Sequence, residues 1–181
     1  MADVEEVWDE ATAAALRARR GDANAAHAFV RATQADVWRL CAHLGSPQTA
    51  DDLTQETYAR AFTSLHRFAG RSSVRTWLLG IARYVCADAV RAAVRERALP
   101  SKPEPLSPDP GEQVALRDLL DGLDPDRREA FVLTQIVGLS YAEAADVCKC
   151  PVGTIRSRVA RARDDLVTGY GGGRQSHASM G

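Results

Sequence analysis

The chain has 181 residues, 45% of them apolar, and a net charge of −1. This length and apolar content are enough for a folded core without metals or disulfides, and the near-neutral charge excludes a uniformly basic nucleic-acid binder. The apolar runs are too short to span a membrane, and the acidic start at residues 1–6 lacks the basic and then apolar pattern of a leader. We therefore expect a cytoplasmic protein.

Charge is unevenly distributed along the sequence. Residues 1–10 carry five acids, residues 71–97 carry six arginines against two acids, and the charged residues of 156–163 are all arginines. The four cysteines are dispersed in a chain without an export signal, so we expect no disulfides. Cys148 and Cys150 have no further ligands at zinc-site spacing, which favours structural thiols over a metal site or a redox sensor. No metal or cofactor is expected.

Apolar residues recur at spacings of three and four, and runs of alternating β-branched residues are missing, so we expect an all-α fold. One predicted helix ends at residues 45–47, and its apolar stripe consists of Val30, Thr33, Val37, Leu40, Cys41 and Leu44. Thr49-x-x-Asp52 has the spacing of a capping motif and predicts a second helix that continues to Phe62.

A loop, Phe68–Ser73, separates this helix from the next, which we expect to begin near Val74 and to run past Val90. The expected buried stripe of this third helix consists of Trp77, Leu78, Ile81, Val85 and Ala89. Its polar side carries Arg83, Tyr84 and Arg91.

Five of the eight prolines fall between Pro100 and Pro110, among Ser, Lys, Glu and Asp. Proline-rich chain is stiff and extended, so this composition predicts a linker over residues 97–111. We therefore expect two small helical domains, at residues 1–96 and 112–168. Residues 169–181 lack apolar periodicity, which predicts a disordered tail.

The second domain has the start and stop signals of a helix-turn-helix. A first helix around Leu120 is followed by one that Asp124 caps and Gly138 closes. Ser140-x-x-Glu143 predicts a capping box for a short helix, and a last helix follows from about residue 152 to residue 167. Two helices joined by so short a turn indicate a helix-turn-helix.

The last predicted helix is amphipathic. Its inward side carries Ile155, Val159, Ala162 and Leu166. The opposite side carries Ser157, Ala160 and Arg161, flanked by Arg156, Arg158 and Arg163. An arginine makes bidentate bonds to guanine in the major groove or charge-assisted bonds to phosphate, and small neighbours let the backbone approach. The pattern favours DNA binding over the alternative, a solvated basic face on an ordinary surface helix.

Two groups of motifs resemble a known family. Residues 140–145, SYAEAA, and 150–163, CPVGTIRSRVARAR, are similar to the fourth conserved region of the extracytoplasmic-function (ECF) sigma factors of the sigma-70 family. Residues 51–62, DDLTQETYARAF, resemble their second region, and 76–83, TWLLGIAR, the helix after it. The resemblance covers about residues 25–168 and is strongest to the actinobacterial sigma-C subgroup. It implies a transcription initiation factor that binds core polymerase, and not an enzyme.

The resemblance implies three sets of site residues. The polymerase set, which would dock on the clamp helices of the β′ subunit, is Asp52, Gln55, Glu56 and Ala59; the alternative is a hydrated acidic face. The minus-ten set, which would open the promoter and capture an extruded base, is Phe68, Arg71, Ser72, Ser73, Arg83, Tyr84 and Arg91. The minus-35 set, which would read the upstream duplex, is Thr154, Arg156, Ser157, Arg158, Ala160, Arg161 and Arg163. The implied partners are RNA polymerase core, through its clamp helices and β flap, and promoter DNA, while an anti-sigma factor is left open.

Three positions depart from the family pattern. Tyr84 stands where many relatives have Asn, and Gly80 where they often have Arg, so the resemblance leaves the preferred minus-ten bases open. Lys149 stands in the helix-turn-helix turn where Gly is common. A positive φ is often needed there, which predicts a modest backbone strain.

Two other classes of protein are the alternatives. A one-component regulator would bind operator DNA without polymerase, but Gln55 and Glu56, and the lack of a larger sensing domain before the linker, argue against it. An enzyme is a weaker alternative, because Cys86 and Cys148 have no recognisable partner motif and no glycine-rich phosphate loop or paired-carboxylate signature is present.

Overall fold

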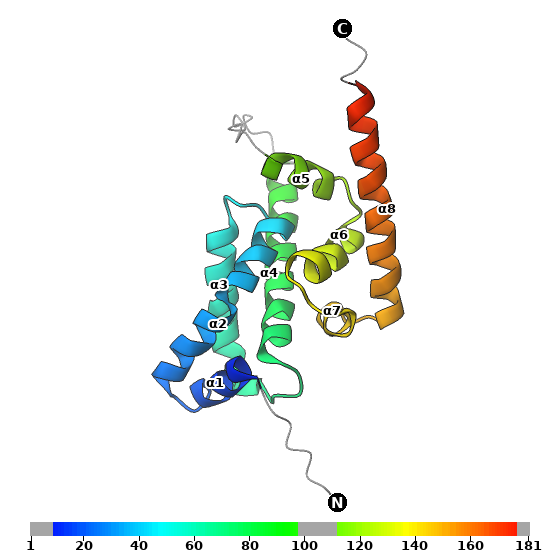
Figure 1. Cartoon of the computed structure of the whole chain (residues 1–181). Helices are drawn as coiled ribbons and strands as arrows, with labels where there is room; N and C mark the ends of the chain where they lie inside the picture. The colour runs from blue at the N-terminus through cyan, green and yellow to red at the C-terminus, as the bar shows by residue number, and fades with distance from the viewer. Residues whose placement is uncertain (1–8, 98–111, 177–181) are drawn as a thin grey trace, which may run out of the picture. The chain divides into compact units, whose positions relative to one another are not determined.

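The computed structural model describes residues 9–97 and 112–176, and within these residues the chain is helical, with no strand (Figure 1). The all-α prediction is confirmed. The chain forms two compact units, Met1–Asp88 and Ala89–Gly181, and the division falls inside one long helix. Residues 98–111, which include most of the predicted linker, lie outside the described residues.

The first unit contains three helices, one short 3₁₀ turn and the greater part of a fourth helix. In chain order they are α1 (Glu10–Ala18), α2 (Ala23–Leu44), α3 (Ala50–Ser64), η1 (Leu65–Arg67) and α4 (Val74–Arg97). The side chains of Asp9 and Asp22 cap α1 and α2 by accepting backbone N–H bonds from the first turn. α2 packs against both α1 and α3. α4 begins next to α1, since the Val74 N–H donates to the Thr12 hydroxyl.

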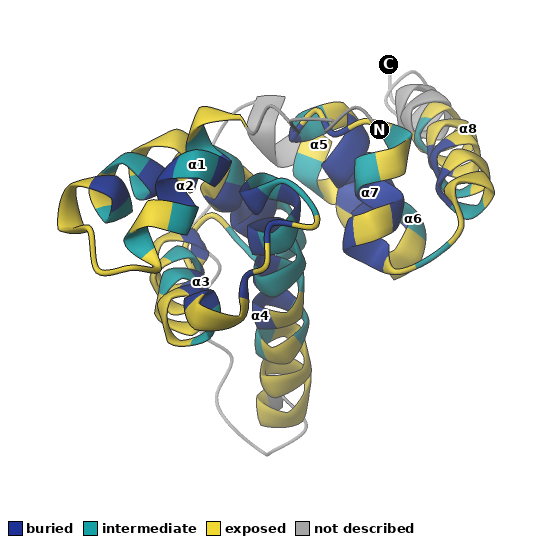
Figure 2. Cartoon of the chain, turned by 90° about the horizontal axis from the view of Figure 1, so that it is seen from below, coloured by how far each residue is buried: buried dark blue, intermediate teal, exposed yellow. Residues whose placement is uncertain are grey.

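Each helix of this unit buries one side and leaves the other exposed (Figure 2). On α2 the predicted stripe is largely correct, because Thr33, Val37, Leu40 and Cys41 are buried, whereas Val30 and Leu44 are half-buried. On α4 the prediction is partly wrong. Leu78 and Val85 are buried, but Trp77, Ile81 and Ala89 are only half-buried. The buried side of α4 instead includes Val74, Leu79, Ala82 and Cys86. Small side chains such as Ala82 and Cys86 carry little hydrophobic signal, yet they occupy the close-packed side of the helix.

The predicted cap of α3 is also only partly correct. Thr49 does occupy the N-cap position, but its side chain makes no capping hydrogen bond. Its hydroxyl bonds to Ser46 of the preceding turn instead. Asp52 is therefore not needed for a reciprocal capping bond, and it lies exposed in the first turn.

The second unit contains α5 (Glu112–Asp121), α6 (Pro125–Phe131), a π-helical turn η2 (Val132–Ile136), α7 (Tyr141–Cys148) and α8 (Val152–Ser176). Asp124 caps α6 as predicted, and Gly138, with φ +82°, closes the segment. α6 and α7 both pack on α8. The core includes Leu120, Leu123 and Ala162, with Phe131, Ile136 and Leu166 packed against them.

The helix-turn-helix forms as its local signals predict. The Ser140 N–H donates to Glu143 Oε2 at 2.8 Å and the Glu143 N–H donates to Ser140 Oγ at 3.2 Å, which is the complete capping box. Lys149 ends α7 in the left-handed conformation, with φ 55° and ψ 44°. The positive φ predicted from the departure at this position is confirmed.

α8 is longer than the sequence indicated. We predicted that it ends near Val167 and that disorder starts at Gly169, but the helix continues to Ser176. Gly169 lies beside α5, where an added Cβ would come within 3.3 Å of Leu119 Cδ2. This tertiary contact supports the extension, because adding residues to an existing helix costs much less than nucleating a new one.

Candidate functional site

The exposed side of α3 carries the four residues predicted to bind polymerase. Asp52, Gln55, Glu56 and Ala59 are all exposed. The opposite side of the helix, including Leu53, Thr57 and Ala61, is buried. Helical spacing therefore brings the predicted set together on one solvent-facing surface, which we call the α3 face (Asp52, Gln55, Glu56, Ala59).

Glu56 already has a partner within the chain. Arg60 Nε donates to Glu56 Oε1 at 2.6 Å, and Arg60 Nη1 donates to Asp88 Oδ2 of α4 at 2.9 Å. The hydrogen bond to Asp88, and to a smaller extent the one to Glu56, raises the pKa of the Arg60 guanidinium above its usual value. The acidic character of the α3 face is therefore partly neutralised at Glu56, while Asp52 has no ion pair within the described residues.

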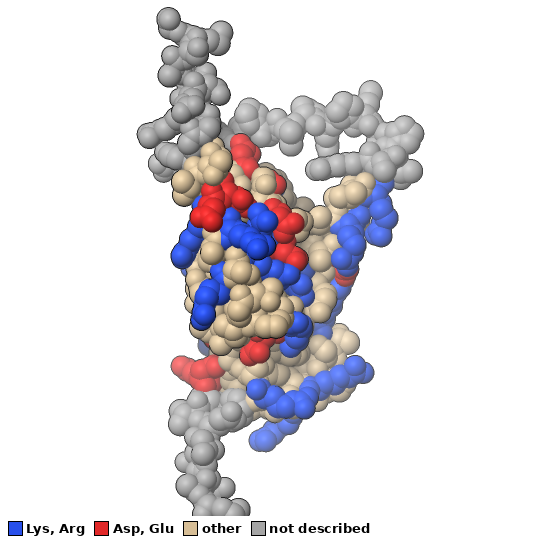
Figure 3. All heavy atoms as spheres, turned by 90° about the vertical axis from the view of Figure 1, so that its right-hand side faces the viewer, with Lys and Arg blue, Asp and Glu red and all other residues tan. Residues whose placement is uncertain are grey.

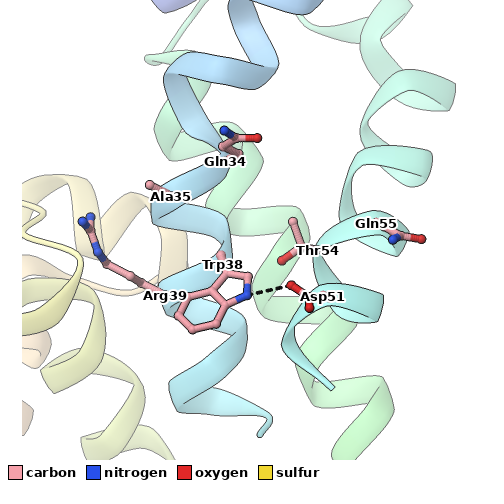
Figure 4. A pocket seen from close by; sticks show the side chains of 7 residues that line it. All are labelled: Gln34, Ala35, Trp38, Arg39, Asp51, Thr54 and Gln55. Carbon is pink, nitrogen blue, oxygen red and sulfur yellow. Dashed lines mark hydrogen bonds between the residues drawn. The ribbon is translucent and has the colours of Figure 1, made fainter. Parts of the chain in front are cut away.

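A groove next to the α3 face was missed by the sequence analysis. It has a volume of about 640 Å³ and is lined by Gln34, Ala35, Trp38, Arg39, Asp51, Thr54 and Gln55. Trp38 is 42% exposed, and its Nε1 donates to Asp51 Oδ1 at 2.9 Å, so its side chain reaches across the groove from α2 to the start of α3 (Figure 4). Trp38 stands outside the apolar stripe of α2. A tryptophan at such a position was the signal that could have revealed this surface.

An aromatic cluster lies at the other end of the same surface. Phe62 is exposed, and its ring packs edge-on against the buried ring of Phe29 at 6.0 Å. Tyr58 packs beside both, and its hydroxyl shares a hydrogen bond of 2.7 Å with Thr33. Burial raises the pKa of Tyr58 to about 12, so this hydroxyl keeps its proton at physiological pH. The cluster fixes α3 against α2.

The loop Phe68–Ser73 alternates between buried and exposed residues over its first four positions. Arg71 is exposed and Ser72 is half-buried. Phe68 is 3% exposed and its ring packs on Trp77 with centroids 5.0 Å apart. The ring of Phe68 is therefore part of the core, and its contact with DNA stays a prediction. The Ser73 hydroxyl accepts from the Thr76 N–H at 3.1 Å and so caps α4.

The polar side of α4 carries the remaining predicted minus-ten residues. Tyr84 is 54% exposed, and the Arg83 guanidinium lies 5.3 Å from the centre of its ring. Arg91, about two helical turns further along α4, is also exposed. Arg83 and Arg91 each make further interactions within the chain. A cation over an exposed aromatic ring leaves the other face of the ring open for stacking on a base.

The predicted minus-35 residues lie together on the outer side of α8. Arg156, Ser157, Ala160, Arg161 and Arg163 are exposed, and Thr154 and Arg158 are half-buried. The inner side, Ile155, Val159 and Ala162, is buried. The predicted amphipathic pattern of this helix is confirmed.

The arginines of α8 differ in their partners. Arg158 is paired with Asp126 at the start of α6, and its Nη1 lies 3.9 Å from Cys150 Sγ. Arg163 Nη2 donates to Gln135 Oε1 at 2.8 Å. Arg156 and Arg161 have no such partner among the residues that the structure describes. Figure 3, which faces the side of α8 in Figure 1, accordingly shows blue basic side chains close to red acidic ones and no uninterrupted basic patch.

The described residues contain neither a metal-binding cluster nor a membrane-spanning helix. No group of three His, Cys, Asp or Glu side chains there could hold a metal ion. No helix in these ranges is long and apolar enough to cross a membrane. All four cysteines carry free thiols, and Cys41, Cys86 and Cys148 are buried.

Two protein-family models match the chain. The model described as Sigma-70 region 2 matches residues 29–96, and the model described as Sigma-70, region 4 matches residues 113–166. The first match contains the α3 face, the loop and α4, and the second contains the helix-turn-helix.

Curated relatives match over most of the chain. A "Probable RNA polymerase sigma-C factor" of Mycobacterium bovis is 53% identical over 169 residues, which is 88% of this chain and 91% of the relative. The "ECF RNA polymerase sigma factor SigC" of Mycobacterium tuberculosis has the same identity and coverage. An "ECF RNA polymerase sigma-E factor" of Salmonella typhimurium is 34% identical, with 83% of this chain and 88% of the relative covered.

Solved structures match as well. CnrH in complex with the cytosolic domain of CnrY is similar with a TM-score of 0.72 and 28% identity, and the match covers 88% of this chain and 96% of that one. The sigma factor RpoE of Bartonella quintana, in complex with the anti-sigma factor NepR, is similar with a TM-score of 0.65 and 29% identity, over 76% of this chain and 91% of that one.

Proposed function

Because the chain belongs to the ECF sigma factors of the sigma-70 family, and is thus a transcription initiation factor, we propose that it divides promoter recognition between its two compact units. The first unit, together with the remainder of α4, binds polymerase and the opened minus-ten strand. The second unit reads the minus-35 duplex. The observation that carries this division is that the predicted polymerase set is exposed on one face of α3 and most of the predicted minus-35 set on one face of α8, while the opposite faces of both helices are buried.

For polymerase binding, we propose the α3 face together with the neighbouring groove. The family resemblance assigns the clamp helices of the β′ subunit to this helix. Asp52 and Gln55 offer an exposed carboxylate and an amide to a basic partner. Trp38 adds an exposed aromatic ring beside Gln55, and tryptophan is among the residues that dominate the binding energy of protein interfaces.

For the minus-ten element, we propose that Arg71 and Ser72 of the loop meet the extruded base and that α4 follows the strand. Tyr84 offers an exposed ring for stacking, and Arg83 and Arg91 offer positive charge to the phosphates. Extrusion of a base costs a few kcal/mol, so a preformed receiving surface and the polymerase must together supply that free energy. Phe68 and Ser73 support the loop from inside.

For the minus-35 element, we propose that α8 enters the major groove. Arg156 lies in the second turn of α8, and helix-turn-helix proteins read base edges with the first turns of this helix. Ser157 and Ala160 are small enough for close backbone approach. Arg161 and Arg163 are placed further along, where phosphate contacts are expected.

The proposed action is binding alone. Sigma factors are non-enzymatic regulators, and we propose that the polymerase supplies the chemistry of RNA synthesis, in the cytoplasm where its DNA template lies. A third candidate partner is an anti-sigma factor, since the solved neighbour from Bartonella quintana is bound to one. Such a partner would act by covering the α3 face or the outer side of α8.

The test is reconstitution with core RNA polymerase. The double variant Gln55→Ala, Glu56→Lys should lose co-migration with core in size-exclusion chromatography, because a cation then faces the basic partner. Asp118→Lys is the matched control, since it places the same charge on an exposed position of α5. Normal co-migration of the double variant would contradict the proposed polymerase surface.

The same reconstitution separates the sigma factor from a one-component regulator. Wild-type protein should give specific transcript starts only with core, and the free chain should bind promoter duplex weakly because its net charge is −1. Tight and specific duplex binding by the free chain, unchanged by Tyr84→Ala, would favour the regulator instead.

A further inference from the structure

Helix α1, with its C-cap residue Arg19, makes hydrogen bonds at both ends of the segment from Phe68 to Val74, which contains the loop Phe68–Ser73. At the first end, Arg19 Nη1 donates to the Phe68 carbonyl oxygen at 2.6 Å. At the second end, the Val74 N–H donates to the Thr12 hydroxyl oxygen at 2.9 Å. Thr12 and Arg19 are seven residues apart, so they lie on the same side of α1, about 10 Å apart along its axis at 1.5 Å per residue. α1 therefore bridges the ends of the loop.

The contact at Thr12 is fully buried and its direction is fixed. Thr12 is 0% exposed, and its hydroxyl donates to Asp9 Oδ2 at 2.8 Å, while Asp9 Oδ1 accepts the Thr12 N–H at 2.8 Å. Since the hydroxyl hydrogen is committed to Asp9, a lone pair of the oxygen is left for the Val74 N–H. That N–H belongs to the first residue of α4, where no carbonyl of the helix itself is available.

The middle of the loop has a different character from its ends. At the first end of the loop, Phe68 packs on Trp77. Two residues later, Gly70 adopts φ +71°, a conformation that favours glycine. At the second end of the loop, Ser73 caps α4. Arg71 is exposed between them. The loop is therefore anchored at both ends and open to solvent at its tip.

We propose that Thr12 and Arg19 are positioning residues for promoter opening, and that α1 holds the loop in the shape that receives the extruded base. This inference rests on the proposed minus-ten role of the loop. Fixing the backbone of one residue costs about 1–2 kcal/mol, so a loop ordered beforehand captures a base without that cost at the moment of binding. α1 lies before residue 29, where the match to the region 2 family model begins.

The experiment uses holoenzyme assembled from core polymerase and full-length chain. Its probes are a single-stranded oligonucleotide with the nontemplate minus-ten sequence of a promoter mapped with the wild type, and the upstream duplex of the same promoter. The variants are Arg19→Met and Thr12→Val, which remove the two bonds. Arg20→Met is the matched control, because Arg20 is an equally exposed arginine one residue further along. Thr12→Ser is the rescue, because it restores the hydroxyl.

We expect Arg19→Met and Thr12→Val each to weaken oligonucleotide binding about tenfold, which corresponds to one loop residue that must be ordered on binding. Upstream duplex binding and co-migration with core should be unchanged. Arg20→Met should bind like the wild type, and Thr12→Ser should recover most of the affinity. The split between the two DNA probes distinguishes a loop effect from a general loss of folding.

Arg71→Ala, at the tip of the loop, makes the outcomes distinguishable. If Arg71→Ala binds the oligonucleotide normally, the proposed role of the loop itself fails. If Arg71→Ala weakens binding but Arg19→Met binds like the wild type, the loop role stands and the inference about α1 is overturned. Arg19 is exposed, so Arg19→Met should fold normally. The comparison of Arg71→Ala with Arg19→Met therefore still tests the inference if Thr12→Val does not fold. Equal losses on both DNA probes would also overturn the inference.

Discussion

The arginines of α8 carry the same charge but differ in whether an acidic side chain of the same unit pairs with them. Arg158 must give up its ion pair with Asp126 before it can bind a phosphate, whereas Arg156 needs no such exchange. An exposed ion pair contributes at most about 1 kcal/mol to folding, so Asp126 is not essential for the fold. Its effect is to lower the attraction of α8 for any phosphate backbone. Asp126 thus reduces binding to DNA that offers no base contacts.

Asp126→Asn should therefore increase the affinity of the full chain for duplex DNA of any sequence. The freed Arg158 adds about one phosphate contact, so the slope of log K against log salt should become steeper by roughly one unit. Fluorescence anisotropy over a salt series measures both quantities. Asp118→Asn removes the same charge from α5 and is the control. An equal change in both variants would mean that net charge, and not the freed arginine, is responsible.

At the scale of elements, the turn between α7 and α8 stores backbone strain at Lys149. A left-handed conformation costs a residue with a Cβ about 1–2 kcal/mol, a steric cost that glycine avoids. Glycine also has greater conformational freedom in the unfolded chain, which offsets part of the stability gained by avoiding that cost. The turn still forms because the Lys149 N–H bonds to the Ala145 carbonyl oxygen and α7 and α8 pack on each other. Packing therefore outweighs the local preference of the residue.

Lys149→Gly should stabilise the helix-turn-helix by about 0.5–1 kcal/mol. Native-state hydrogen exchange of the amides in α7 and α8, followed by mass spectrometry, measures the free energy of opening for this element. Lys149→Ala keeps the Cβ and should give no such gain. If Lys149→Ala stabilises the element as much as Lys149→Gly, the loss of the lysine charge is the cause and the strain argument is wrong.

At the scale of the whole molecule, the two compact units are expected to unfold separately. Trp38 and Trp77 belong to the first unit, and no tryptophan occurs in residues 89–181, so tryptophan fluorescence does not report on the second unit. Circular dichroism reports on the helices of both units. The full chain should therefore give urea transitions that do not coincide between the two signals. A destabilising change in the second unit, such as Ile155→Ala, should shift the circular dichroism transition only. Coincident shifts in both signals would show one cooperative unit.

Much of the fold and of the site follows from signals that are local in the sequence. The Asp124 cap and the Ser140–Glu143 capping box depend on residues only a few positions apart, and each was predicted correctly. The outward faces of α3 and α8 follow from helical periodicity in the same way. A sequence motif at such spacing determines the element and its exposed side, and hence which residues are available to a partner.

Tertiary structure decided the contacts between residues far apart in the chain. It buried Phe68 against Trp77, paired Arg158 with Asp126 across 32 positions, and extended α8 past Gly169 through its contact with Leu119. It also joined Thr12 to Val74, 62 positions away, which gave α1 its proposed role. Periodicity identifies which side of a helix is apolar, but it carries no information about which other helix covers that side. The partner of each buried or charged group is fixed only when the helices pack, because packing and hydrogen bonding select among many faces of similar composition.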